Sequence, residues 1–176
     1  MKIIVRILAV IAGLIGLVLV VALFVKNDYD VHREIVINKP KSEVFEYARH
    51  LENQKLYNTW LMADPNVKIE SKGTDGTVGF IYSWDGNDQV GQGEQQIKNI
   101  VEGERLETEI HFIEPFEALA QEYLLTEVAG ANQTKVTWGM KGESKYPMNI
   151  MNLFNESMLG KDMVKSLENL KGALEK

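Results

Sequence analysis

The chain has 176 residues, of which 45% are hydrophobic and 25% are charged, and it contains no cysteine. This composition excludes a disulfide framework and a thiol nucleophile, and it is not that of a disordered chain. Three of the 19 basic residues and none of the 25 acidic ones precede residue 27, which leaves 16 basic against 25 acidic groups, a net charge of −9, on the remainder. Because such a charge repels phosphate backbones, we do not expect nucleic acid as a partner.

The first 26 residues differ from everything that follows. Nineteen consecutive residues without a charge run from Ile7 to Val25, close to the ~20 residues that span a bilayer core. A cleaved signal peptide is the alternative, but its apolar region is usually shorter, ~7–15 residues, and ends in small residues at a cleavage site. We therefore predict a membrane anchor over residues 1–26, followed by one domain over residues 27–176.

The charges around this anchor do not determine which side of the membrane its amino terminus occupies. Lys2 and Arg6 precede the apolar run, and Lys26 and Arg33 follow it, so the basic residues alone do not decide the side. A very short basic leader is typical of a signal anchor with its amino terminus inside. We expect a single-pass membrane protein whose domain is extracytoplasmic.

The domain begins with a predicted strand and two short helices. Apolar and polar residues intermix from Asp28 to Pro40, which favours a strand closed by Asn38, Lys39 and Pro40. Helical spacing follows in two groups, one made of Val44, Phe45, Ala48 and Leu51 and the other of Leu56, Tyr57 and Trp60. Asp64-Pro65 ends the pair.

From about residue 67 to 141 the apolar period becomes two, which predicts strands. One face is expected to carry Val78, Phe80, Tyr82 and Trp84, a second strand Leu106, Ile110 and Phe112, and a third Val136, Trp138 and Met140. The segment DGND after Trp84 indicates a hairpin. The segment EALAQEYLLTEV is another strand, but parity does not assign its inward face. We count six or seven strands in an antiparallel meander.

The last segment, from Asn149 to Lys176, is predicted to be one long amphipathic helix. Its apolar positions, three to five residues apart, are Met151, Phe154, Met158, Met163, Leu167, Leu170 and Leu174. The order of elements gives an α+β fold in which a curved sheet wraps around this helix to bury the stripe.

Three segments carry a resemblance to a known superfamily: INKPKSEVFEYARHLENQKLYNTW, VGQGEQQIKNIVEGERLETEIHFIEPFEA and TKVTWGMKGESKYPMNIM. Over roughly residues 30 to 175, the chain resembles the START-like helix-grip superfamily, specifically the SRPBCC group often labelled polyketide cyclase/dehydrase and lipid transport. The resemblance implies seven antiparallel strands around a carboxy-terminal helix. It also implies a hydrophobic cavity, which in various members holds lipids, sterols, polyketides or plant hormones.

Large apolar residues predicted to face inward are the candidates for lining such a cavity. They are Phe80, Tyr82, Trp84, Phe112, Trp138, Met140, Met151, Phe154 and Met158. Plain core packing is the alternative role for each of them. Methionine suits surfaces that accept varied apolar shapes, and five of the seven methionines lie between residues 140 and 163.

Motifs for catalysis, metals or cofactors are scarce. The three histidines, His32, His50 and His111, show no metal-site spacing, and GQGEQQ lacks the third glycine and the following helix of a nucleotide-binding loop. We assign no catalytic residue, no metal and no cofactor. Glu94 and Asp64 are candidate polar anchors or acid/base groups, with a solvated carboxylate as the alternative for each.

Three functions remain open at this point. The first is a membrane-anchored domain that binds or transfers a lipid or another hydrophobic small molecule, with the anchor keeping the pocket near its reservoir. The second is a cyclase- or dehydrase-like enzyme, which requires a buried acid/base group with a perturbed pKa. The third is an interaction module whose cavity is filled by its own side chains.

Overall fold

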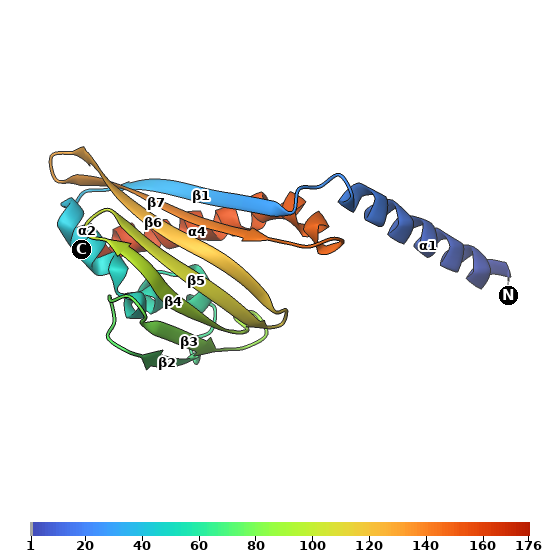
Figure 1. Ribbon diagram of the computed structural model, residues 1–176, viewed down its shortest axis with the longest axis horizontal. Coiled ribbons are helices and arrows are strands. Elements are labelled where there is room, and N and C mark those ends of the chain that lie inside the picture. Colours follow the sequence, from blue (N-terminus) through green and yellow to red (C-terminus); the bar gives the residue numbers. More distant parts are fainter. Residues whose placement is uncertain (1) are drawn as a thin grey trace.

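A seven-stranded antiparallel sheet forms the body of the domain in the computed structural model, which describes residues 2–176. The strands follow the order β1-β7-β6-β5-β4-β3-β2, so six of the seven form a meander and β1 closes against β7. Their bounds are β1 Asp28–Ile37, β2 Lys68–Lys72, β3 Ile81–Asp85, β4 Gln92–Val101, β5 Arg105–Glu114, β6 Ala118–Gly130 and β7 Gln133–Glu143. The sheet curves around the last helix, α4 (Figure 1), which confirms the predicted helix-grip fold.

The alternating side chains of the strands decide which face of the sheet is covered. Leu106 and Ile110 of β5 and Val136, Trp138 and Met140 of β7 are buried, as their period of two predicts. In β3 the prediction was wrong at one position. The strand begins only at Ile81, and the exposed Val78 lies in the turn before it.

The connection between β1 and β2 is helical but more broken than predicted. Helix α2 (Lys41–Arg49) starts directly after Pro40 and buries its apolar face. The expected second helix is instead a 3-10 turn, η1 (Leu51–Leu56), and a one-turn helix, α3 (Thr59–Met62). The break has a local cause, because the side chain of Asn58 accepts a hydrogen bond from the backbone N–H of Trp60 and caps a new helix.

The carboxy-terminal helix is preceded by a 3-10 turn, η2 (Met148–Met151), and α4 itself spans Asn152–Leu174. Met163, Leu167, Leu170 and Leu174 are buried against the sheet and the helical connection. The prediction that the stripe continues through the start of the helix was wrong, because Met151, Phe154 and Met158 are exposed. At ~100° per residue, the five-residue step from Met158 to Met163 turns the apolar face by ~140°.

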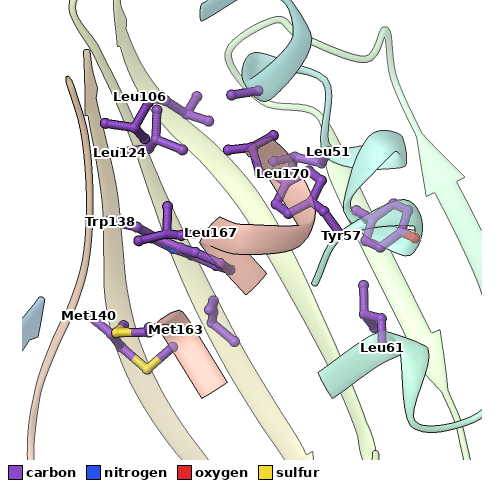
Figure 2. Close-up of a cluster of buried hydrophobic side chains, with 14 of the residues drawn as sticks. Leu51, Tyr57, Leu61, Leu106, Leu124, Trp138, Met140, Met163, Leu167 and Leu170 are labelled. Atoms are coloured by element: carbon purple, nitrogen blue, oxygen red, sulfur yellow. The ribbon is translucent and has the colours of Figure 1, made fainter. Parts of the chain in front are cut away.

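The core lies between the concave face of the sheet and the helices. Figure 2 shows Leu167 and Leu170 of α4 between Trp138 of β7 and Tyr57, which follows η1, and it shows Met163 beside Met140. The rings of Tyr57 and Trp60 both meet Trp138 edge to face, with 6.2 Å between ring centroids in each pair. These contacts close the core along the carboxy-terminal half of α4.

Helix α1 (Lys2–Ala22) projects from the domain (Figure 1) and is exposed along its length except at Ala22. It is long and apolar enough to cross a membrane, a property that a signal sequence shares. Asn149 of η2 donates hydrogen bonds from its side-chain nitrogen to the carbonyl oxygens of Ala22 (2.7 Å) and Val25 (2.8 Å). Asn152 does the same to Lys26 (3.0 Å) and Asn27 (2.8 Å). The bond to Ala22 reaches a carbonyl group at the end of α1, the other three reach the linker that follows, and together they join α1 to the start of α4.

Candidate ligand cavity

A cavity of about 440 Å³ lies between the sheet, α3 and the first half of α4. Its size falls within the range of small-molecule sites in proteins, roughly 300–1,000 Å³. Its apolar lining residues are Trp60, Leu61, Trp84, Val90, Ile110, Phe112, Pro115, Phe116, Ala118, Met140, Met158 and Leu159. The polar ones are Gln54, Asn58, Gln89, Gln95, Glu114 and Glu122. The cavity therefore has apolar walls with a few polar groups among them.

Three neighbouring strands form a buried polar cluster that reaches the cavity wall through Gln95 and Glu122. Gln95 of β4, Thr108 of β5 and Glu122 of β6 are all buried on the concave face, and Thr108 lies directly opposite Glu122 in the strand register. The side-chain nitrogen of Gln95 donates hydrogen bonds to Thr108 Oγ1 (2.8 Å) and to Glu122 Oε1 (3.0 Å). Gln95 thus fixes the position of the carboxyl group of Glu122 in the cavity wall.

Burial changes the acidity of Glu122. Removal from water raises the pKa of this carboxyl group from 4.5 to about 7, although the nearby N–H groups of Trp138 and Gln95 act in the opposite direction. The indole nitrogen of Trp138 is buried without a hydrogen-bond partner of standard geometry, so it offsets burial only in part. At neutral pH, Glu122 can therefore either donate or accept a proton within the apolar cavity.

Four of the nine apolar residues predicted to line a cavity lie in the wall of this one: Trp84, Phe112, Met140 and Met158. They come from β3, β5, β7 and α4, so the fold brings together residues more than 70 positions apart in the sequence. The rings of Trp84 and Phe112 meet edge to face at a centroid distance of 6.3 Å and form one wall together.

The other five predicted residues lie elsewhere. Phe80, Tyr82 and Trp138 are fully buried in the core and are not part of the cavity lining. Met151, at the end of η2, and Phe154, at the start of α4, are exposed and lie outside the cavity.

The two predicted polar anchors also lie outside the cavity lining. Asp64 is buried, and its carboxylate accepts hydrogen bonds from the backbone N–H groups of Asn66 (2.9 Å) and Asn87 (2.8 Å), which ties the end of α3 to the β3–β4 connection. Glu94 neighbours Gln95 in β4, and since successive side chains alternate, it faces the opposite side of the sheet.

Glu122 and Gln95 are the buried, hydrogen-bonded polar pair of the cavity wall that sequence reasoning missed. In β6 the inward set, which includes Ala120, Glu122 and Leu124, is as mixed in polarity as the outward set, which includes Leu119 and Tyr123. The alternation of side chains along β6 therefore does not predict that Glu122 faces inward. The signal lies in the pairing, because Glu122 is opposite both Thr108 and the inward-facing Met140.

The remaining acidic and histidine residues offer no metal centre. In the part of the chain that the structure describes, residues 2–176, no group of three or more His, Asp or Glu side chains is placed to hold a metal ion. The lining of the cavity thus holds two carboxyl groups, of which Glu122 is buried and Glu114 is exposed.

Known proteins resemble this chain in structure and not in sequence. No protein-family model matches the sequence, and no curated protein matches it either.

Solved structures do resemble this chain. Norcoclaurine synthase from Thalictrum flavum is 9% identical with a TM-score of 0.64, and the match covers 84% of this chain and 93% of that protein. A hypothetical protein from Helicobacter pylori is 11% identical, with a TM-score of 0.62 and coverages of 84% and 88%. A major latex-like protein from Panax ginseng is 12% identical, with a TM-score of 0.55 and coverages of 84% and 97%. Together with the sheet order and the gripped helix, these likenesses establish that the chain has the helix-grip fold.

Proposed function

We propose that this protein is a membrane-anchored domain that binds a small hydrophobic molecule carrying one hydrogen-bonding group. The observation that supports it best is the 440 Å³ cavity, whose apolar walls surround the buried pair Glu122 and Gln95. An apolar ligand body gains ~25 cal/mol per Å² of surface removed from water. One polar contact fixes its orientation, because a polar group of the ligand that is buried without a hydrogen-bond partner costs free energy, and Glu122 can be that partner.

The proposed ligand meets a defined set of side chains. Trp84, Phe112, Met140 and Met158 contact its apolar body, and Glu122 bonds to its polar group. With a pKa of about 7, Glu122 suits a hydroxyl, carbonyl or amine group, since the carboxyl group can both donate and accept. A ligand with a permanent negative charge is disfavoured at this position.

The proposed role of α1 is to hold the cavity next to a membrane. The helix has the length and composition to cross a bilayer, and the domain of residues 27–176 follows it after a short linker. A tether raises the effective concentration of the cavity at the surface where apolar molecules accumulate. Lipids or lipid-soluble metabolites are therefore the first ligands to test.

The test uses the full chain in nanodiscs made of one synthetic phosphatidylcholine, followed by extraction and mass spectrometry of co-purifying molecules. Ala118 lines the cavity and is exposed at its mouth, so Ala118→Trp should block entry. Ala131→Trp, at the exposed β6–β7 turn, is the matched control. We expect one apolar species near stoichiometric amount in the wild type and in the control, and its loss in Ala118→Trp. Equal amounts of the apolar species in Ala118→Trp and Ala131→Trp would contradict the proposal.

Acid/base catalysis on the bound molecule is a second candidate, favoured by the raised pKa of Glu122. A general acid or base works best when its pKa lies near the operating pH. Norcoclaurine synthase, which shares the fold, has been solved with dopamine and hydroxybenzaldehyde. If the protein is an enzyme, Glu122→Gln should retain the ligand and abolish its conversion, whereas equal turnover by wild type and Glu122→Gln would exclude this role.

A further inference from the structure

The start of α4 presents apolar side chains to solvent in several directions. We call Met148, Met151, Leu153, Phe154 and Met158 the apolar start of α4; all are exposed, and Phe154 is 52% exposed. Leu153 and Phe154 are adjacent, so they point ~100° apart and cannot share one docking face on the sheet. Large apolar side chains exposed together on one short segment mark a site of contact with a protein or a membrane.

The position of this surface is fixed relative to α1. Asn149 and Asn152, which lie within the apolar start of α4, hold the backbone of residues 22–27 through four hydrogen bonds. The surface therefore begins where the membrane-spanning run of α1 ends, at Ala22. Any bilayer that contains α1 has its surface next to these side chains.

The mouth of the cavity lies at the same end of the domain. In the strand register Asp28 pairs with Glu143, Gly142 with Ala120 and Ala118 with Phe112, which places the β5–β6 connection at the sheet end where β1 leaves α1. Figure 1 shows α1, the start of α4 and this connection on one side of the domain.

Two exposed side chains link the cavity to the apolar surface. Phe116 of the β5–β6 connection is 75% exposed and Met158 of α4 is 58% exposed, and both also line the cavity. Exposed apolar side chains therefore extend from the apolar start of α4 to the mouth of the cavity.

The flanking residues suit a lipid surface. Lys26 and Lys145 are exposed near the hydrogen bonds that join α1 to the start of α4. Their charged ends can reach lipid head groups while their hydrocarbon stems stay in the apolar region. Tyr146 is half-exposed next to Lys145, and tyrosine is enriched at the membrane–water interface. Because the domain as a whole is acidic, apolar contact and not attraction to anionic lipid must supply most of the binding.

We propose that the apolar start of α4 and Phe116 lie in the interfacial region of the bilayer that holds α1, so that the cavity opens directly onto lipid. This inference rests on the membrane anchor of the proposed function. It adds that the ligand enters and leaves through the membrane surface and not through bulk water.

The test exploits the absence of native cysteine, which allows one environment-sensitive fluorophore to be attached at a chosen position. Single variants Phe154→Cys and Phe116→Cys probe the proposed contact. Val128→Cys is the matched control, because Val128 is an apolar residue, 71% exposed, near the β6–β7 turn at the opposite end of the sheet. All three positions are exposed, so labelling should leave the fold intact. Each labelled full-length protein is placed in phosphatidylcholine nanodiscs with and without brominated acyl chains.

We expect a blue-shifted emission and several-fold stronger quenching by brominated lipid at positions 154 and 116 than at 128. Quenching that is equal at all three positions, or absent at 154 and 116, would overturn the proposal. A blue shift at 154 without quenching would also overturn it, because it would indicate that protein and not lipid covers this surface. The cavity proposal is judged separately by ligand loss in Ala118→Trp, so failure of one does not decide the other.

Discussion

The two halves of α4 contain similar apolar residues but have opposite environments. From Met163 to Leu174 the helix buries its methionine and leucines against β7 and the helical connection. From Asn152 to Met158 the same kinds of side chain are exposed, next to α1 and the mouth of the cavity. The difference shows that apolar spacing along a helix predicts a face, whereas what covers that face depends on the elements that the fold brings to it.

The largest expected effect comes from removing apolar volume in the covered half. Leu167 is fully buried, so Leu167→Ala leaves a cavity and should lower the free energy of unfolding by ~2–5 kcal/mol. Phe154→Ala, in the exposed half, should change it by no more than ~0.5 kcal/mol, because the exposed ring makes few contacts within the domain. Urea unfolding of the full chain in a mild detergent, followed by tryptophan fluorescence, measures both.

Val164→Ala is the control within the covered half, because Val164 lies three residues from Leu167 but is partly exposed and faces away from the core. It should behave like Phe154→Ala. If Leu167→Ala and Phe154→Ala destabilised the protein equally, the two halves would not differ in the way the structure shows.

Most of the fold was predictable from the sequence, because strand periodicity and helix spacing are local. Val136, Trp138 and Met140 alternate without ambiguity, and all three are buried as expected. The cavity was less predictable, since its wall depends on register between strands. Glu122 is hidden in a strand whose two faces are equally mixed, and it becomes recognisable only when Thr108 and Gln95 are placed beside it.

Glu122 tests the difference between the two halves of α4 from the side of the sheet, because it faces the cavity between the sheet and the exposed half of the helix. Its pKa rises from 4.5 in the unfolded chain to about 7 in the folded protein. Below pH 4.5 both states are protonated and folding carries no penalty. Between pH 4.5 and 7 the unfolded chain loses its proton first, so stability falls with rising pH by up to about 3 kcal/mol, and above pH 7 the loss is constant.

Glu122→Gln removes this titration and can keep the hydrogen bond from Gln95 at the same oxygen position. Its advantage in stability over the wild type should therefore grow between pH 4.5 and 7 and then level off, as measured by urea unfolding across that range. Parallel curves for wild type and Glu122→Gln would mean that the carboxyl group is well solvated. The raised pKa on which the acid/base role of Glu122 depends would then be absent.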